Sequence, residues 1–169
     1  MSSKMYALTI KETGHVLAVA TAMGAPEETP PVEALAGGAF PFRYGDVAFP
    51  VPADRLGVAE VAVDPNLLVN PAGFRVDENG DTRPVPTTPK ATVEATATET
   101  ALTIKAPGAE KLTAVVLVAH HPNGPVGPFT LTIGKGDSGA IALTTPQGKS
   151  FDCLVAAPGL SILVTKVGP

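Results

Sequence analysis

Residues Gly136-Asp137-Ser138-Gly139 place a serine hydroxyl between glycines, a setting in which serine can act as a nucleophile. Such a serine needs a base, usually histidine, within hydrogen-bond reach, and the base needs a carboxylate to orient it. The chain supplies these groups in the order His15, then an aspartate at 46, 54 or 64, then Ser138. Ser138 with His15 is therefore the candidate catalytic pair of a serine hydrolase.

The tetrapeptide resembles the nucleophile loop of chymotrypsin-like serine peptidases, which share the order His, Asp, Ser. Only 14 residues precede His15, too few for the strands that come before the histidine in that family. Ala140 and Ile141 stand where the family usually has a second Gly and a Pro. The glycines and Asp137 equally suit a turn between strands, because Gly supplies positive φ and Asp bonds its own backbone. We prefer the turn and expect no catalytic residue.

Two other clusters carry metal-binding residue types. Asp77-Glu78-Asn79-Gly80-Asp81 alternates oxygen ligands as a Ca²⁺ loop does, but its glycine comes one position early and no Glu follows before Glu94. Asn79-Gly80 is itself a hairpin signal. His120 and His121 follow an apolar strand and point to opposite faces, which prevents them from sharing one metal. We expect a turn, strand-end histidines, and no metal or cofactor.

The composition restricts the kind of partner. Charged residues make up 17% of 169, net charge is −4, and mean hydropathy is +0.23. No basic patch of the kind that binds a phosphate backbone is present, so nucleic acid is excluded as an expected partner. No apolar run reaches the ~18 residues of a membrane span, and no signal peptide is visible. A chain with so little charge and so high a hydropathy is expected to cover part of its surface by self-association.

The tripeptide Leu-Thr-Ile recurs at 8–10, 102–104 and 131–133, each time before glycine-containing turn residues and a second apolar run. Alternating apolar residues and β-branched content predict strands. The pattern therefore predicts three hairpins. The segment Ala-Leu-Thr-Ile-Lys occurs at both 7–11 and 101–105, which leaves duplication and chance recurrence open.

Leu112–Ala119 has apolar side chains on both faces, which an antiparallel strand with one face in water does not have. We therefore expect both faces to be covered, one of them by the Pro-rich arm at 26–52 of this chain or of a neighbour. The residues expected to make such contacts are Phe40, Phe42, Tyr44, Phe49, Val116 and Val118.

The whole pattern predicts an all-β chain, an antiparallel β-sandwich or small barrel built from hairpins, with Pro-rich extended segments. Residues 1–81 form a β-rich N-terminal region that contains the arm. Residues 82–98 read as a linker or edge strand because three prolines precede an Ala/Thr/Glu run. Residues 99–169 form a C-terminal sandwich-like domain.

Three functions follow, from different classes. The leading one is a non-catalytic structural or assembly subunit of a larger complex, a phage-like or tail-like particle component by analogy of composition alone. Its partners would be copies of itself or other protein subunits, and its location the cytoplasm or an assembled particle. The alternatives are a ligand- or carbohydrate-binding β-module and a serine hydrolase that uses Ser138.

Overall fold

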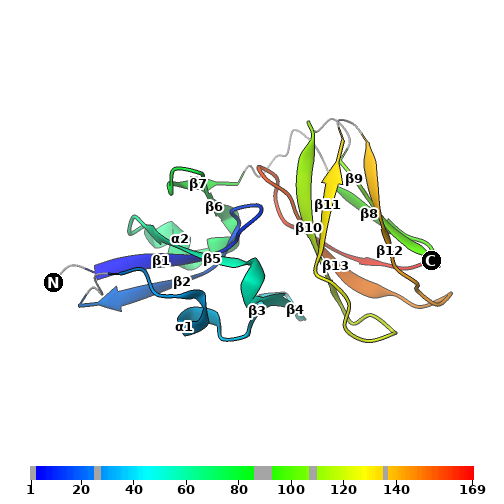
Figure 1. Ribbon diagram of the computed structural model, residues 1–169, viewed down its shortest axis with the longest axis horizontal. Coiled ribbons are helices and arrows are strands. Elements are labelled where there is room, and N and C mark those ends of the chain that lie inside the picture. Colours follow the sequence, from blue (N-terminus) through cyan, green and yellow to red (C-terminus); the bar gives the residue numbers. More distant parts are fainter. Residues whose placement is uncertain (1–2, 25–27, 86–92, 107–109, 135–136) are drawn as a thin grey trace. The chain divides into compact units, whose positions relative to one another are not determined.

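The computed structural model describes residues 3–24, 28–85, 93–106, 110–134 and 137–169 (Figure 1). The chain divides into two compact units. The N-terminal unit comprises Met1–Phe40 and Val51–Val85, and the C-terminal unit comprises Pro41–Pro50 and Pro86–Pro169. Each unit is described separately below.

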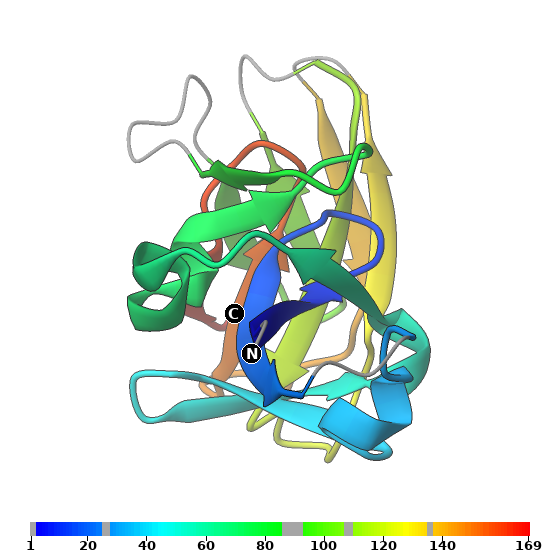
Figure 2. The same cartoon turned by 90° about the vertical axis from the view of Figure 1, so that its left-hand side faces the viewer.

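The N-terminal unit is built on a three-stranded antiparallel sheet of order β2-β1-β5 (Figure 2). The strands are β1 (Ser3–Ile10), β2 (Val16–Met23) and β5 (Leu56–Val61). β1 and β2 form the first of the three expected hairpins. Its turn requires Gly14, which has a φ of 72° and whose Cβ, if present, would lie 2.3 Å from the Val76 carbonyl oxygen.

One face of this sheet is covered by the unit's own connections. Leu67 of helix α2 (Pro65–Val69) joins a buried cluster with residues of all three strands. That helix begins at Asp64, whose carboxylate accepts a hydrogen bond from the Asn66 backbone N–H at 2.8 Å and so caps the first turn. The other members of the cluster are Met5, Ala7, Val16 and Val61.

Shorter elements complete the first half of the chain. Helix α1 (Val32–Ala36) is followed by the paired strands β3 (Ala39–Tyr44) and β4 (Val47–Pro52). Two 3-10 turns, η1 (Ala53–Arg55) and η2 (Pro71–Gly73), flank β5 and α2. Strands β6 (Phe74–Val76) and β7 (Thr82–Pro84) pair across Asn79-Gly80, which confirms the hairpin predicted there.

The C-terminal unit contains two antiparallel sheets. The first has the order β11-β10-β13-β14, and the second has the order β12-β9-β8. The strands of the first sheet are β10 (Leu112–Ala119), β11 (Phe129–Ile133), β13 (Phe151–Ala156) and β14 (Leu163–Val167). Those of the second are β8 (Glu94–Ala97), β9 (Ala101–Lys105) and β12 (Ser138–Ala142).

Two of the three predicted hairpins are wrong. β9 and β10 lie in different sheets, and so do β11 and β12, so each connection crosses from one sheet to the other. The misreading has a physical reason. Glycine-containing turn residues between two apolar runs serve a tight hairpin and a sheet-to-sheet crossing equally well, because both need a sharp reversal of the chain between two strands.

The crossings give the two sheets a common core. Leu102 and Ile104 of β9 lie in one buried cluster with Val116 of β10 and Cys153 of β13. Phe151 and Val155, which alternate with Cys153 along β13, belong to it too. Burial raises the pKa of the Cys153 thiol to about 12, so the thiol behaves as an apolar residue.

Strand β10 is buried on both faces, as its sequence predicted. Val116 and Val118 face the common core, while Val115 and Leu117 on the opposite face are 0% and 2% exposed. Its neighbour β13 is also buried along its whole length. These two strands form the most apolar part of the fold.

The chain is thus all-β and its paired strands are antiparallel, which confirms the predicted fold class. Each sheet ends in two edge strands, so the described residues form no closed barrel, and the two sheets with one core give the C-terminal unit a sandwich-like arrangement. Of the segment expected to be a linker or edge strand (82–98), residues 86–92 lie outside the described residues. Its flanks are strand β7 and the edge strand β8.

The crossing from β11 to β12 generates a test. A Cβ on Gly139 would lie 2.7 Å from Cγ of Leu131, and Gly139 is not at positive φ, so the constraint is space rather than backbone conformation. Gly139→Ala should destabilise the protein by about 1–3 kcal/mol through overpacking. Gly38→Ala, at a glycine with open space around its Cβ position and no positive φ, should change stability by less than about 0.5 kcal/mol.

Denaturant unfolding of Gly139→Ala in the wild-type and Leu131→Ala backgrounds measures the coupling directly. Gly139→Ala should lower the free energy of unfolding by less in the Leu131→Ala background, because the side chain that the new Cβ would displace is absent there. An equal cost in both backgrounds would show that β11 and β12 do not pack in this way.

Candidate functional site

Two histidines and an aspartate of the C-terminal unit lie where β10 ends. The chain leaves the strand through His120, whose φ of 56° is the one positive value among the described non-glycine residues. Positive φ costs energy in a residue with a Cβ and is kept only where the surroundings enforce it. His120 and His121 thus end a strand at a surface loop, as predicted.

His120 is held by a carboxylate. Its Nδ1 lies 2.7 Å from Oδ2 of Asp152, which is 32 residues away on β13. The Asp152 side chain is 11% exposed and that of His120 is 65% exposed, so the carboxylate lies inside and the imidazole outside. A neutral imidazole that donates from Nδ1 to this carboxylate presents the unprotonated Nε2 away from it. This geometry is that of an oriented base.

His121 has a different, structural environment. The Asn123 backbone N–H donates to its Nδ1 at 3.2 Å, so Nδ1 is an acceptor and the proton resides on Nε2. That Nε2–H donates to the Thr145 hydroxyl at 3.3 Å, and the ring packs against Phe151 with centroids 5.2 Å apart. The Asn123 side chain also donates to the Thr144 carbonyl at 3.0 Å. His121 therefore joins the loop after β10 to the segment after β12.

The candidate catalytic pair falls in separate units. His15 is fully buried in the N-terminal unit, where its Nδ1 is 2.9 Å from the Thr13 hydroxyl. Ser138 is exposed at the start of β12 in the C-terminal unit, opposite Lys105 of β9. Among the described hydrogen bonds, none joins Ser138 to a histidine, and His120 is bonded to Asp152 rather than to a hydroxyl. Two parts of a triad are present at His120, without a bonded nucleophile in the described residues.

The residues expected to contact a partner take different positions. Val116 and Val118 lie in the core of the C-terminal unit, and Phe42 and Phe49 are 5% and 0% exposed. Phe40 is partly buried, and Tyr44 is 49% exposed. Of these six side chains, Tyr44 is the one that offers most of its surface to a partner.

The exposed large apolar side chains instead gather in the N-terminal unit. Among the described residues, five such side chains are exposed, and three of them lie within residues 63–69. Val63, Leu68 and Val69 are 58%, 48% and 86% exposed. We call these three residues the 63–69 surface. The sequence alone does not predict this surface, because which of these side chains are exposed depends on how α2 packs under the sheet.

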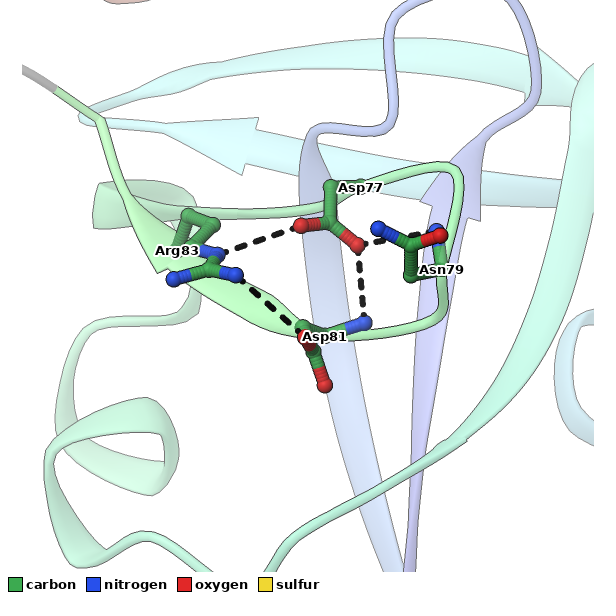
Figure 3. Close-up of polar contacts among 4 residues, drawn as sticks. All are labelled: Asp77, Asn79, Asp81 and Arg83. Carbon is green, nitrogen blue, oxygen red and sulfur yellow. Dashed lines mark hydrogen bonds and ion pairs between the residues drawn. The ribbon is translucent and has the colours of Figure 1, made fainter.

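The acidic turn between β6 and β7 is closed by its own hydrogen bonds (Figure 3). Asp77 Oδ1 accepts from the backbone N–H groups of Asn79 and Asp81, both at 3.0 Å, while Oδ2 accepts from Arg83 Nε at 3.1 Å. A second Arg83 nitrogen reaches Asp81 at 3.3 Å. The carboxylate that would be the first ligand of a Ca²⁺ loop is therefore used within the turn, with an arginine beside it.

The electrostatics of Asp77 agree with this structural role. Desolvation alone would raise its pKa, but the hydrogen bond from Arg83 and those from the Asp81 and Asn79 backbone together outweigh it. The net result is a pKa below the ordinary 3.8. The carboxylate is thus held in its charged form by the turn.

Within the described ranges, no group of three or more His, Cys, Asp or Glu side chains is arranged to hold a metal ion. In the same part of the chain, no helix has the length and apolar character needed to cross a membrane. Comparisons of the chain with protein-family models, curated proteins and solved structures found no match.

The pairing of His120 with Asp152 was also missed from the sequence. One signal was available: Asp152 is the single charged residue of β13, alternating with Phe151 and Cys153, which places it on the opposite face of an otherwise apolar strand. A carboxylate in such a strand requires a partner. Which partner it finds depends on the pairing of β10 with β13, where Asp152 lies opposite Ala119, next to His120.

The turn gives a pH-dependent prediction. Because the folded-state pKa of Asp77 is depressed, its contribution to stability is present above the unfolded value and is lost as the pH falls through the folded value. Asp77→Asn should therefore lower the free energy of unfolding at pH 7, and the difference from wild type should shrink below pH 3.8. Asp81→Asn removes the same charge but only the longer contact with Arg83. It should therefore lower the free energy of unfolding by less than Asp77→Asn does.

Urea unfolding of the three proteins between pH 3 and pH 7 provides the measurement. A difference between wild type and Asp77→Asn that stays constant over this range would contradict the charged role of Asp77 in the turn.

Proposed function

We propose that this protein is a non-catalytic structural subunit that acts by assembling with copies of itself or with other protein subunits. The observation that carries the proposal is the 63–69 surface: three large apolar side chains are left exposed within seven consecutive residues. Clustered exposed apolar residues are typical of protein–protein contact sites. A phage-like or tail-like particle is one setting for such a subunit, by analogy of composition.

The local structure supports this use of the surface. In α2, Leu67 is fully buried in the cluster under the sheet, while the next two residues, Leu68 and Val69, face outward. These two side chains lie on a helix that is capped at its start and followed directly by the 3-10 turn η2. A preformed apolar surface loses little conformational entropy when a partner covers it.

The oriented His120 with its buried Asp152 favours the hydrolase alternative in one respect, since it is a base held by an acid. A nucleophile bonded to it is the missing part. Labelling of Ser138 by a fluorophosphonate probe would support the hydrolase and count against the proposal. The ligand-binding alternative has Tyr44 as its exposed aromatic residue.

The test is the mass of the protein in solution. Sedimentation velocity over a range of concentrations should give a defined mass above the 17.1 kDa of one chain. Val69→Asp should lower that mass or weaken association at least tenfold, because it places a charge in the apolar contact.

Asn70→Asp is the matched control, since it adds the same charge one position along at an exposed polar residue. It should leave the mass unchanged. A wild-type monomer at every concentration would contradict self-assembly, and equal effects of the two variants would contradict the role of the 63–69 surface.

A further inference from the structure

Four asparagines occur in the chain, and the residue that follows each one determines how easily its side-chain amide can be lost. The loss begins when the backbone nitrogen of the next residue attacks the side-chain carbonyl carbon. The proline after Asn70 has no N–H for this attack, and the Leu67 side chain obstructs it at Asn66. Glycine leaves the approach open because it has no Cβ. Glycine follows the other two asparagines, at Asn79-Gly80 and Asn123-Gly124.

The two Asn-Gly sites share their backbone setting. Both glycines are at positive φ, 83° at Gly80 and 96° at Gly124, and both have open space where a Cβ would lie. Each glycine N–H donates at 3.0 Å to the carbonyl of the third residue before it. Both asparagines are exposed. The attack therefore requires a turn to open at either site, and the backbone does not distinguish the two.

The side-chain amides of the two sites differ. Asn123 is tethered, because its Nδ2 donates to the Thr144 carbonyl at 3.0 Å. Within the described chain, the side-chain amide of Asn79 makes no hydrogen bond, since its contact with the Asp77 carboxylate is made by the backbone N–H (Figure 3). When the turn opens, the Asn79 side chain can therefore rotate toward the next backbone nitrogen. Asn123 must first break its bond to Thr144.

We propose that Asn79 is a site of spontaneous covalent modification, because the fold leaves its amide free to be converted to a carboxylate while it preserves Asn123. In the first step, base removes the proton of the Gly80 nitrogen, which bonds to Cγ of Asn79, and ammonia leaves as a cyclic succinimide closes. In the second step, water opens the ring at either carbonyl and leaves aspartate or isoaspartate. One water is consumed and one ammonia is released, so no oxidant or reductant is required.

The modification would change the turn that Asp77 closes. Asp77 Oδ1 accepts from the backbone N–H groups of residues 79 and 81, and isoaspartate inserts a methylene into the backbone between these two donors. Their spacing then no longer matches a single acceptor oxygen. The new carboxylate also joins the acidic side chains of residues 77, 78 and 81, of which Arg83 bonds two. Conversion of Asn79 therefore weakens the β6–β7 hairpin.

The experiment incubates the full chain at mildly alkaline pH and follows each asparagine by peptide mass spectrometry and by an isoaspartate-specific methyltransferase. In the folded protein, Asn79 should convert at least about tenfold faster than Asn123, because an intramolecular reaction slows steeply when the reacting group is held out of place. In guanidinium chloride the tether to Thr144 is lost, and the ratio of the two rates should fall severalfold. Asn79→Gln, whose longer side chain closes a ring less readily, should remove conversion at position 79 and leave the rate at Asn123 unchanged.

Equal rates at the two sites in the folded protein, or faster conversion of Asn123, would overturn the proposal. An unchanged ratio in guanidinium chloride would overturn it as well, because the flanking sequence rather than the fold would then select Asn79. Converted protein, separated by ion exchange, should have a lower free energy of unfolding than unconverted protein. An equal value would contradict the weakening of the β6–β7 hairpin.

Discussion

Two adjacent strands of the C-terminal unit, β10 and β13, carry apolar side chains on both faces, and both faces must be buried. The rest of that unit is arranged around this constraint. One face of the pair meets β9 and β12 in a common core, which requires the chain to cross between sheets after β9, after β11 and again after β12. The other face is buried too, with Leu117 and Leu154 2% and 0% exposed. Burying a large aliphatic side chain contributes about 1.5–3 kcal/mol, so strands buried on two faces dominate the stability of such a unit.

The same constraint explains the polar cluster at the end of β10. A carboxylate on a buried strand is costly unless it is hydrogen-bonded, and Asp152 meets this need through His120 at the strand end. The partnership holds His120 in a left-handed backbone conformation, while His121 turns inward to Thr145 and Phe151. The buried apolar pair of strands thus fixes the position of an exposed imidazole that is held by a carboxylate.

The sequence predicted those features that depend on local pattern. The all-β class, the two-faced burial of β10 and the Asn79-Gly80 hairpin all follow from alternation, turn residues and apolar content. It failed where the outcome depends on which strands pair. Glycines before Ser138 read as a hairpin turn, yet β12 pairs with β9, because the choice between hairpin and crossing is made by the core that both strands share. The His120–Asp152 contact and the 63–69 surface escaped for the same reason: both depend on tertiary placement rather than on spacing.

The account of function depends on the apolar side chains that the N-terminal unit leaves exposed at 63–69. The central claim, that the protein associates through this surface, is tested most directly by hydrogen–deuterium exchange at low and high protein concentration. Amides of residues 66–70 should become more protected as the concentration rises, while those of β12 (138–142) stay unchanged. Equal exchange of 66–70 at every concentration, in a sample whose mass rises, would contradict the claim that the 63–69 surface is where the copies meet.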